Sequence, residues 1–399
     1  MDLSGLSQLL TPQGWALLEA LPPYREDTAL ALGERLRADG LDPALVAAAL
    51  TQSRLRAKGH TKFGPFADGM LFTADGLEQA TRLEVAARHA QRYAGAGVER
   101  VADLGCGIGG DAMALAGLEL GVLAVDRDEL TAAVATVNLR HWPEAEVRCE
   151  DVTGTDLSGV GGAFLDPARR TSAGKRVLDP WQASPPWDYV LAVAERLPAT
   201  GAKVAPGIKH SMLPEGTETQ WVSVDGDVVE AGVWFGPLAR PGVRRSALLL
   251  RDGRATTVDD AGMPVPDAGA VGGYLYEPDG AVVRAGLVGQ VAVEVDGRLL
   301  DRSIAFVTSD RLVRTPLARA FVVEEQLPFG LKSLRTRLRD RGIGAVELIK
   351  RGSAVDVQQL RRQLRLSGTG SATVVLTRVA GQQTVLLCRP VQPPAAQTG

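Results

Sequence analysis

The first ninety residues carry apolar side chains at the spacing of amphipathic helices. The pattern predicts helices at residues 12–21, 27–38, 43–58 and 78–93, with a break at residues 62–66. Asp27 and Asp42 are the expected N-caps, and Gly40 and Gly59 are expected to end the helices that precede them. The chain therefore begins with a predicted helical region, residues 1–90.

From about residue 98 the pattern changes to short apolar runs that alternate with helical segments. Alternation of this kind predicts an α/β domain whose parallel sheet is covered on both faces. Two further apolar runs, joined through Asp225 and Gly226, predict a hairpin at the end of the sheet. We therefore expect a Rossmann-like domain over residues 91–251.

Beyond residue 251 the sequence predicts a connector and a smaller α+β domain. Residues 252–318 are rich in Gly, Asp and Val and contain short strand-like runs. Residues 319–391 predict the order strand, helix, strand, helix, strand, strand. These elements are expected at residues 319–325, 331–341, 344–350, 355–364, 372–378 and 383–388. The Pro-rich end, residues 392–399, is expected to be disordered.

Composition places the chain among globular proteins of more than one domain. Its 399 residues are 45% hydrophobic and 23% charged, with a net charge of -3. That charge argues against a uniformly basic surface but leaves room for a local basic face. The cysteines show no metal-ligand or disulfide spacing, the histidines are scattered, and no apolar run is long enough to span a membrane. We expect a cytoplasmic protein with no signal peptide and no resident metal.

The most informative segment is residues 101–111, where an apolar strand leads into a glycine-rich loop and then a helix. Gly105, Gly107 and Gly110 fit the G-x-G-x-x-G pattern of nucleotide-binding loops, in which the backbone lies close to the ligand. Asp103 stands shortly before the first glycine. A carboxylate there repels a pyrophosphate but suits a cationic or amine-bearing ligand such as S-adenosylmethionine.

Three later strands also end in acids. Asp126 follows the glycines by roughly twenty residues, where an acid accepts hydrogen bonds from ribose hydroxyls. Asp151 ends the third strand and is placed to accept from an adenine amino group, and Asp166 ends the fourth. This order resembles the class I S-adenosylmethionine-dependent methyltransferases, so the resemblance implies S-adenosylmethionine as the cofactor. The expected cofactor contacts are Asp103, Gly105, Cys106, Gly107, Gly109, Asp126, Arg127, Asp151 and Val152.

The segment before the first strand, residues 79–86, resembles that of the guanine-N2 methyltransferases of RNA caps, the trimethylguanosine synthase-like enzymes. In those enzymes a Thr-x-x-Glu segment helps to close the cofactor pocket. The resemblance makes Thr81 a further cofactor-binding candidate, together with Glu84. Helix capping and surface charge would explain these two residues equally well.

Asp166 and Pro167 resemble the fourth motif of methyltransferases that modify amino or ring nitrogens. In that motif an acid or amide side chain and a carbonyl positioned by proline accept hydrogen bonds from the amine. Here Ala168 and Arg169 replace the usual proline and stacking aromatic, and Arg169 or Arg170 could instead stack on a base or hold a phosphate. The expected catalytic residues are Asp166, Pro167 and Arg169.

A second candidate motif is the Ser-Pro-Pro-Trp run at residues 184–187, which resembles the catalytic motif of the same cap-modifying enzymes. It stands directly before a helix expected at residues 188–196. That position favours a structural interpretation, in which Pro185 and Pro186 begin the helix. The run remains the alternative to Asp166 as the catalytic motif.

The C-terminal domain combines a THUMP-like pattern with many cations. Residues 327–332, 349–352 and 374–378 resemble the THUMP-like domain found behind some bacterial methyltransferase domains. THUMP domains bind RNA, so the resemblance implies a structured RNA partner, a tRNA or rRNA, whose phosphates the cations would contact. A solvated, Arg-rich surface is the competing explanation. The cations are Lys332, Arg335, Arg337, Arg339, Arg341, Lys350, Arg351, Arg361, Arg362 and Arg365.

Together these features favour a methyltransferase that modifies a base nitrogen in structured RNA. Two other functions fit parts of the sequence. The departure from the fourth motif at Ala168 and Arg169 fits an RNA-binding protein that holds S-adenosylmethionine without transferring its methyl group. The glycine pattern alone fits an NAD-dependent oxidoreductase, although Asp103 opposes the pyrophosphate of that cofactor.

Overall fold

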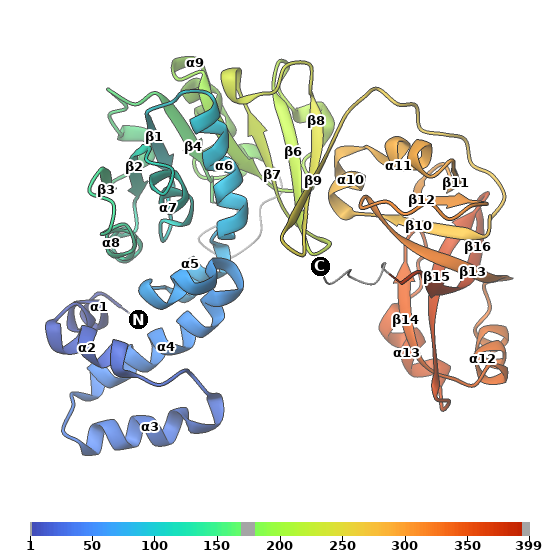
Figure 1. Ribbon diagram of the computed structural model, residues 1–399, viewed down its shortest axis with the longest axis horizontal. Helices are drawn as coiled ribbons and strands as arrows, with labels where there is room; N and C mark the ends of the chain where they lie inside the picture. The colour runs from blue at the N-terminus through green and yellow to red at the C-terminus, as the bar shows by residue number, and fades with distance from the viewer. Residues whose placement is uncertain (1, 169–179, 393–399) are drawn as a thin grey trace, which may run out of the picture. The chain divides into compact units, whose positions relative to one another are not determined.

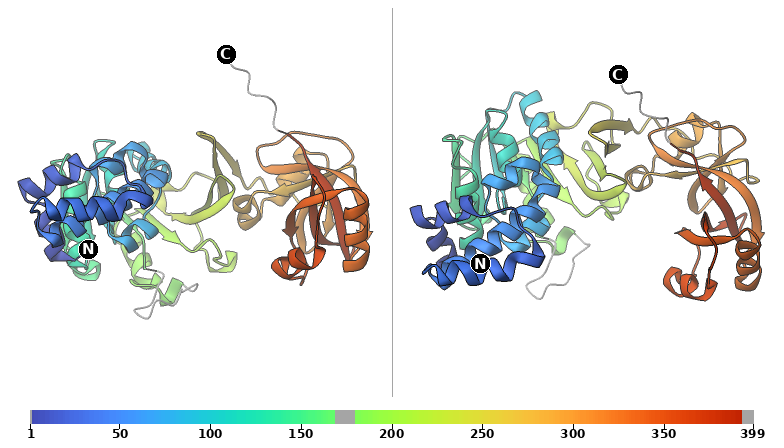
Figure 2. Two further views of the ribbon diagram at one scale, coloured as in Figure 1. Left: turned by 90° about the horizontal axis from the view of Figure 1, so that it is seen from below. Right: turned by 60° about the horizontal axis from the view of Figure 1, so that its bottom comes forward.

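The computed structural model of this protein describes residues 2–168 and 180–392. It consists of two compact units (Figures 1 and 2). The first comprises Met1–Thr217 and Gly232–Pro241, and the second comprises Glu218–Ala231 and Gly242–Gly399. The division falls inside strand β7, Asp227–Trp234, so this strand contributes residues to both units.

Helices make up the N-terminal part of the first unit. They are α1 Leu3–Leu9, α2 Pro12–Ala20, α3 Glu26–Ala38, α4 Pro43–Phe63, α5 Ala74–Gln79 and α6 Leu83–Gly95, with a 3-10 helix at Gly64–Gly69. Asp42 caps α4 as predicted, by accepting hydrogen bonds from the backbone nitrogens of Ala44 and Leu45. Gly40, with a φ of 87°, follows the end of α3. Asp27 lies in the first turn of α3 and does not cap it, because the helix already starts at the preceding residue.

Two further predictions for the helical region are wrong. Helix α4 does not end at Gly59 but continues to Phe63. The glycine instead makes room for the ring of Phe72, whose Cζ would lie 2.9 Å from an added Cβ. The helix predicted to lead into the first strand is interrupted between α5 and α6. The Lys62 ammonium donates hydrogen bonds to the carbonyls of Glu78 (2.6 Å) and Ala80 (2.7 Å), which stabilises the end of α5 at that point.

A parallel sheet with the order β3-β2-β1-β4-β5 follows these helices, and it confirms the predicted α/β fold. Its strands are β1 Arg100–Leu104, β2 Gly121–Asp126, β3 Ala145–Cys149, β4 Gly162–Leu165 and β5 Ala199–Val204. The helices packed on it are α7 Gly110–Ala116, α8 Glu129–Asn138 and α9 Trp187–Arg196. The strand order reverses between β1 and β4. Ligands of open α/β sheets bind at the carboxyl ends of strands beside such a reversal.

The helices and the sheet of the first unit share one apolar core. It includes Leu9 from the helices, Val101 from β1 and Ile108 from the loop that follows β1. Asn138 of α8 accepts a hydrogen bond from the backbone nitrogen of Leu71 (2.8 Å) and donates to the carbonyls of Leu71 (3.0 Å) and Ile108 (2.8 Å). These buried bonds fix the glycine-rich loop against the helical region.

The second unit begins with the hairpin predicted around Asp225 and Gly226. Strand β6, Glu218–Val224, leads into β7 through these two residues, whose φ values of 51° and 90° suit a tight hairpin turn. Strand β6 also pairs in parallel with β8, Arg245–Arg251, and β8 pairs antiparallel with β9, Arg254–Asp259. The predicted hairpin is confirmed, but it does not end the sheet, because β8 and β9 continue the sheet beyond β6.

A seven-stranded sheet with the order β11-β12-β10-β13-β16-β15-β14 follows in the second unit. Its strands are β10 Tyr274–Pro278, β11 Arg298–Asp301, β12 Ile304–Ser309, β13 Ala318–Pro328, β14 Ile343–Lys350, β15 Gly370–Val379 and β16 Gln382–Pro390. The helices are α10 Gly280–Ala285, α11 Val288–Glu294, α12 Leu331–Asp340 and α13 Val357–Leu364. The order predicted for the C-terminal domain is confirmed from β13 to β16. Strands β10 to β12 belong to the same sheet, and helices α10 and α11 are not predicted from the sequence.

Apolar side chains of this sheet alternate between two cores, as the pleat of a strand requires. On one face, Leu334 of α12 and Leu360 of α13 join Val374 of β15. On the other face, the next residue of β15, Val375, joins Phe306 of β12. Helices α12 and α13 therefore contribute to the core on one face of the sheet.

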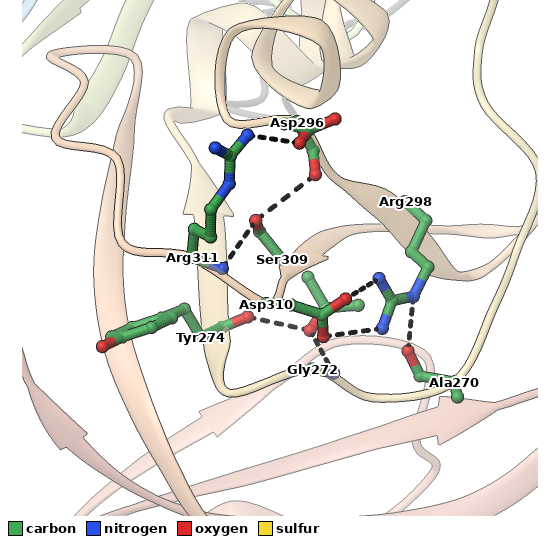
Figure 3. A network of polar contacts seen from close by, with 9 residues as sticks. Ala270, Gly272, Tyr274, Asp296, Arg298, Ser309, Asp310 and Arg311 are labelled. Carbon is green, nitrogen blue, oxygen red and sulfur yellow. Dashed lines mark hydrogen bonds and ion pairs between the residues drawn. The ribbon is translucent and has the colours of Figure 1, made fainter.

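Ion pairs join the loops near one end of β10 and β12 (Figure 3). Arg298 donates to both carboxylate oxygens of Asp310 (2.9 and 3.1 Å) and to the carbonyl of Ala270 (2.7 Å). Arg311 pairs with Asp296 at 2.5 Å, and both of these side chains are mostly exposed. Such exposed pairs contribute little to stability, but they offset the positive charge of the arginines.

Within residues 2–168 and 180–392, no helix combines the length and the apolar character needed to cross a membrane. The same residues contain no group of three or more histidine, cysteine, aspartate or glutamate side chains that could hold a metal ion.

Candidate functional site

Four aspartates gather near the carboxyl ends of β1, β2 and β4. Asp103 lies in β1, Asp126 ends β2, Asp166 follows β4, and Asp111 lies in the first turn of α7. Burial, together with the charges of Asp111 and Asp166, raises the pKa of Asp103 well above its ordinary range. Only 1% of Asp103 is exposed, and its Oδ2 has no hydrogen-bond partner among the described residues. A cation or a hydrogen-bond donor from a ligand would satisfy this oxygen.

The loop between β1 and α7 holds its glycines in backbone conformations that other residues rarely adopt. Gly105, Gly107 and Gly109 have φ values of 90°, 57° and 86°. A Cβ on Gly105 would lie 3.2 Å from the carbonyl oxygen of Asp166, whereas a Cβ on Gly107 would have no described atom within 4 Å. The space beside Gly107 leaves room for a ligand to approach the backbone.

Asp126 fixes the position of this loop. Its Oδ2 accepts a hydrogen bond from the backbone nitrogen of Gly107 (3.1 Å), and its Oδ1 accepts one from the backbone nitrogen of Asp128 (2.9 Å). Burial raises the pKa of Asp126, although these two bonds oppose the shift. Each carboxylate oxygen has a second lone pair, so Asp126 can accept hydrogen bonds from a ligand while it orders the loop.

The remaining cofactor candidates occupy the ends of β2 and β3. Asp151 is exposed, and its Oδ1 accepts from the backbone nitrogen (2.9 Å) and hydroxyl (2.6 Å) of Thr153, which lowers the pKa of Asp151. The carbonyl of Val152 accepts a hydrogen bond from the Tyr189 hydroxyl (2.5 Å). Cys106 is buried in the glycine loop, and Arg127 is exposed after β2.

A chain of buried polar contacts that the sequence does not reveal reaches the same site. Lys203 of β5 donates to Asp166 Oδ2 (2.8 Å) and to Thr81 Oγ1 (3.0 Å). Thr81 also interacts with Asp111 and lowers its pKa, and Asp111 Oδ1 lies 2.8 Å from His89 Nδ1. Thr81 is therefore connected to Asp166 through the Lys203 ammonium.

Two of these residues leave a signal in the sequence. Lys203 interrupts the otherwise uncharged strand β5, and a charge in a buried strand needs a partner. His89 lies at helical spacing with the buried apolar residues of α6. Neither pattern identifies the partner, because Asp166 and Asp111 are distant in the sequence.

The two candidate catalytic motifs lie side by side. Ala168 and Ser184 form an antiparallel bridge, in which the Ala168 nitrogen donates to the Ser184 carbonyl (2.8 Å) and the Ser184 nitrogen to the Ala168 carbonyl (3.3 Å). Helix α9 starts at Trp187, which is 2% exposed, and Pro186 is its N-cap. The tryptophan therefore packs in the interior, and α9 begins directly after the two prolines. Arg169 lies outside the described residues.

Comparison with known proteins decides the family. Over 332 residues the chain is 35% identical to an uncharacterized S-adenosylmethionine-dependent methyltransferase of Mycobacterium tuberculosis, and the match covers 80% of this chain and 89% of the relative. The chain belongs to the S-adenosylmethionine-dependent methyltransferases. This assignment replaces the NAD-dependent oxidoreductase alternative.

Other comparisons match separate segments of this methyltransferase or its overall fold. A THUMP domain-like family model matches residues 318–390, and a model described as a domain of unknown function matches residues 2–59. Over 148 residues the chain is 43% identical to the ribosomal RNA large subunit methyltransferase G of Streptomyces avermitilis, covering 37% of this chain and 33% of the relative. The fold is shared with the crystal structure of a protein of Porphyromonas gingivalis W83 assigned as a methyltransferase. That match has a TM-score of 0.70 at 20% identity and covers 93% of this chain and 100% of the other.

The charges at the site fit the cofactor of this methyltransferase family. Burial and the charges of Asp111, Asp166 and Asp126 raise the pKa of Asp103, because the three neighbouring acids repel the carboxylate form of Asp103. A cofactor with a positively charged sulfur and an amino group relieves that repulsion, whereas a pyrophosphate would add to it. The unpartnered Asp103 Oδ2 and the open space at Gly107 provide places for such a ligand.

We expect cofactor binding to release a proton from Asp103. In the free protein the raised pKa of Asp103 favours the protonated carboxyl, and a bound cation favours the carboxylate. Affinity for S-adenosylmethionine should therefore rise as the pH rises through the pKa of Asp103, with release of up to about one proton. Calorimetry in buffers with different ionisation enthalpies measures this release. Asp103→Asn should abolish it, and an unchanged release in that variant would assign the proton to another group.

Proposed function

We propose that this methyltransferase methylates a nitrogen on a base of a structured RNA, a tRNA or rRNA. The THUMP domain-like match at residues 318–390 carries the RNA part of the proposal, because THUMP domains bind RNA. The match to a ribosomal RNA methyltransferase over 148 residues points in the same direction. The test is methyl transfer by the purified protein to RNA from a strain that lacks the gene, with mapping of the restored nucleoside. Failure of transfer to every RNA fraction of that strain contradicts the proposal.

The cofactor supplies an electrophilic methyl group on a positively charged sulfur. We propose that Asp126 accepts hydrogen bonds from its ribose hydroxyls, Asp151 accepts from its adenine amino group, and Asp103 faces its amino group. The backbone of Gly105 and Gly107 would lie against it. The neighbouring residues expected to line the same surface are Cys106, Gly109, Arg127 and Val152.

Asp166 is proposed to orient the nitrogen that receives the methyl group. Its Oδ2 accepts from Lys203, and its Oδ1 has no hydrogen-bond partner in the part of the chain that the structure describes. An amino group that donates to Oδ1 is held with its lone pair free for the methyl group, which is the geometry that the transfer needs. Pro167 would fix the direction of the chain after Asp166, and Arg169 is proposed to contact the base or a phosphate.

The cations of the C-terminal domain divide into paired and unpaired groups. Arg337 and Arg341 form ion pairs with Glu325 (3.0 and 2.6 Å), and Arg351 lies 3.7 Å from Glu277. Burial lowers the pKa of Arg351. We propose that the cations without an ion pair among the described residues contact RNA phosphates, and we call them the basic face. They are Lys332, Arg335, Arg339, Lys350, Arg361, Arg362 and Arg365.

Removal of two cations of the basic face should weaken RNA binding and its salt dependence. Lys332 and Arg339 are exposed and lie two turns apart on α12. The double variant Lys332→Gln with Arg339→Gln should lower the slope of log affinity against log salt by about 1.5, because each lost phosphate contact leaves a counterion bound. Fluorescence anisotropy with a tRNA at several salt concentrations measures the slope.

A matched control removes two positive charges elsewhere in the second unit. Arg302 pairs with Asp267 and Arg311 pairs with Asp296, each at 2.5 Å. Since their charges are already offset, Arg302→Gln with Arg311→Gln should leave the slope nearly unchanged. Equal losses in the two double variants would show that the basic face has no special role. Salt-independent binding of the unsubstituted protein would show that phosphate contacts do not drive binding.

A further inference from the structure

A chain of buried polar side chains runs from the candidate site into the core of the first unit. It starts at Asp166 Oδ2, 2.8 Å from Lys203 Nζ, and continues to Thr81 Oγ1, 3.0 Å from the same nitrogen. Thr81 interacts with Asp111 and lowers its pKa, and Asp111 Oδ1 lies 2.8 Å from His89 Nδ1. The chain connects the end of β4 with β5, the break before α6, the first turn of α7 and the middle of α6.

The members of this chain beyond Asp166 are mostly buried, and the side chain of Asp111 is 12% exposed. The side chain of Asp166 is 27% exposed, that of Lys203 is 4% exposed and that of His89 is 6% exposed. A buried ammonium is costly unless partners satisfy it, so Lys203 depends on Asp166 and Thr81. An apolar side chain of similar volume could fill the same part of the core at least as well. Packing alone therefore does not account for a lysine at this position.

The inner end of the chain is firmly held. The ring of His89 lies 4.9 Å from that of Phe164, a residue of β4. Burial acts to raise the pKa of Asp111, but the hydrogen bond and the charge of His89, and then the charge of Lys203, lower it overall. Thr81 also lowers the pKa of Asp111, and its Oγ1 accepts a hydrogen bond from Lys203. Since an ammonium can only donate, Asp166 Oδ2 is an acceptor as well.

We propose that Lys203 is a positioning residue for methyl transfer: it holds the Asp166 carboxylate by Oδ2 and so presents Oδ1 to the nitrogen that receives the methyl group. This inference rests on the proposed role of Asp166. The bond to Thr81 fixes the ammonium from its inner side, so the core determines the orientation of Asp166. A small displacement of the nitrogen that receives the methyl group lowers the rate of transfer before it lowers the affinity for RNA, because the reacting atoms must be aligned.

Two substitutions of Lys203 test the inference by turnover. Lys203→Met keeps a similar volume without the ammonium, and Lys203→Gln keeps a donor without the charge. With RNA from a strain that lacks the gene as acceptor, Lys203→Met should lower kcat by roughly ten- to a hundredfold. The KM for RNA and the Kd for S-adenosylmethionine should change by less than about threefold. Lys203→Gln should recover part of kcat. A loss of affinity with an unchanged kcat overturns the inference.

Combination with Asp166→Ala separates positioning from a general structural role. If Lys203 acts through Asp166, Lys203→Met lowers kcat no further in the Asp166→Ala background. Lys62→Met is the matched control, because Lys62 is also partly buried but bonds to the carbonyls of Glu78 and Ala80. Burial and the charge of Lys203 lower the pKa of Lys62 to about 8. The fold-loss of kcat caused by Lys62→Met should multiply with the fold-loss caused by Asp166→Ala. If the fold-loss caused by Lys203→Met also multiplies with that of Asp166→Ala, the inference is overturned.

A crystal structure of Lys203→Met tests the inference without any substrate. We expect the Asp166 carboxylate to leave its present orientation or to occupy two. An unchanged orientation of the Asp166 carboxylate overturns the positioning role of Lys203, even if the protein is shown to methylate RNA. If no RNA accepts a methyl group, the proposed function fails, while this structure still decides the role of Lys203. Should Lys203→Met fail to fold, the structure of Lys203→Gln provides the same comparison.

Discussion

Asp166→Ala is expected to lower kcat by roughly a hundredfold or more, while affinity for S-adenosylmethionine changes by less than about threefold. The side chain lies after β4, beside the glycine loop, with Oδ1 unpartnered among the described residues. Its loss removes a contact that matters most when the nitrogen attacks the methyl group. Single-turnover methylation of RNA from a strain lacking the gene measures the rate, and calorimetry measures cofactor affinity.

The comparison variant is Asp166→Asn, whose amide oxygen still accepts a hydrogen bond, so its loss of kcat should be smaller. Both variants disturb the partner of a buried ammonium, because Lys203 is 4% exposed. Asp166→Ala should therefore also lower the thermal stability of the protein, and unfolding curves must accompany the rates. Turnover at the wild-type rate in folded Asp166→Ala would place the catalytic centre elsewhere. Ser184, bridged to Ala168, is then the next residue to test.

The parts of the site that the sequence predicts are those that follow from the ends of strands. Asp103 and Asp126 stand where apolar runs stop, and parallel strands bring such ends to one edge of a sheet. The fold of the first unit and the order of elements from β13 to β16 follow from the same periodicity. Local pattern is sufficient there, because each element carries its own signal.

The parts that the sequence does not predict depend on contacts between distant residues. The bridge of Ala168 to Ser184 and the bonds of Lys203 to Thr81 and Asp166 join segments with no shared pattern. Gly59 is misread for a similar reason, since its role is to admit the ring of Phe72 and not to end a helix. A glycine or a charge in the sequence indicates a special environment, but only the tertiary fold identifies what it faces.

Gly107→Val is expected to weaken binding of S-adenosylmethionine at least tenfold, which corresponds to about 1.4 kcal/mol or more. A Cβ at Gly107 would meet no described atom within 4 Å, so the valine would occupy the space proposed for the cofactor. The φ of 57° also strains a β-branched residue. Asp126→Ala should have an effect of at least the same size. It removes the proposed ribose acceptor and also the carboxylate that holds the backbone nitrogen of Gly107.

Gly97→Val separates the two effects of the valine. Gly97 has a φ of 70° and also no described atom within 4 Å of an added Cβ, but it lies between α6 and the start of β1, away from the carboxyl ends of the strands. Its substitution should carry a similar backbone strain and leave cofactor affinity unchanged. Calorimetry on the folded variants decides the matter. If Gly107→Val binds the cofactor as tightly as Gly97→Val, or if Asp126→Ala retains wild-type affinity, the cofactor does not lie against this loop, and the role proposed for Asp103 fails with it.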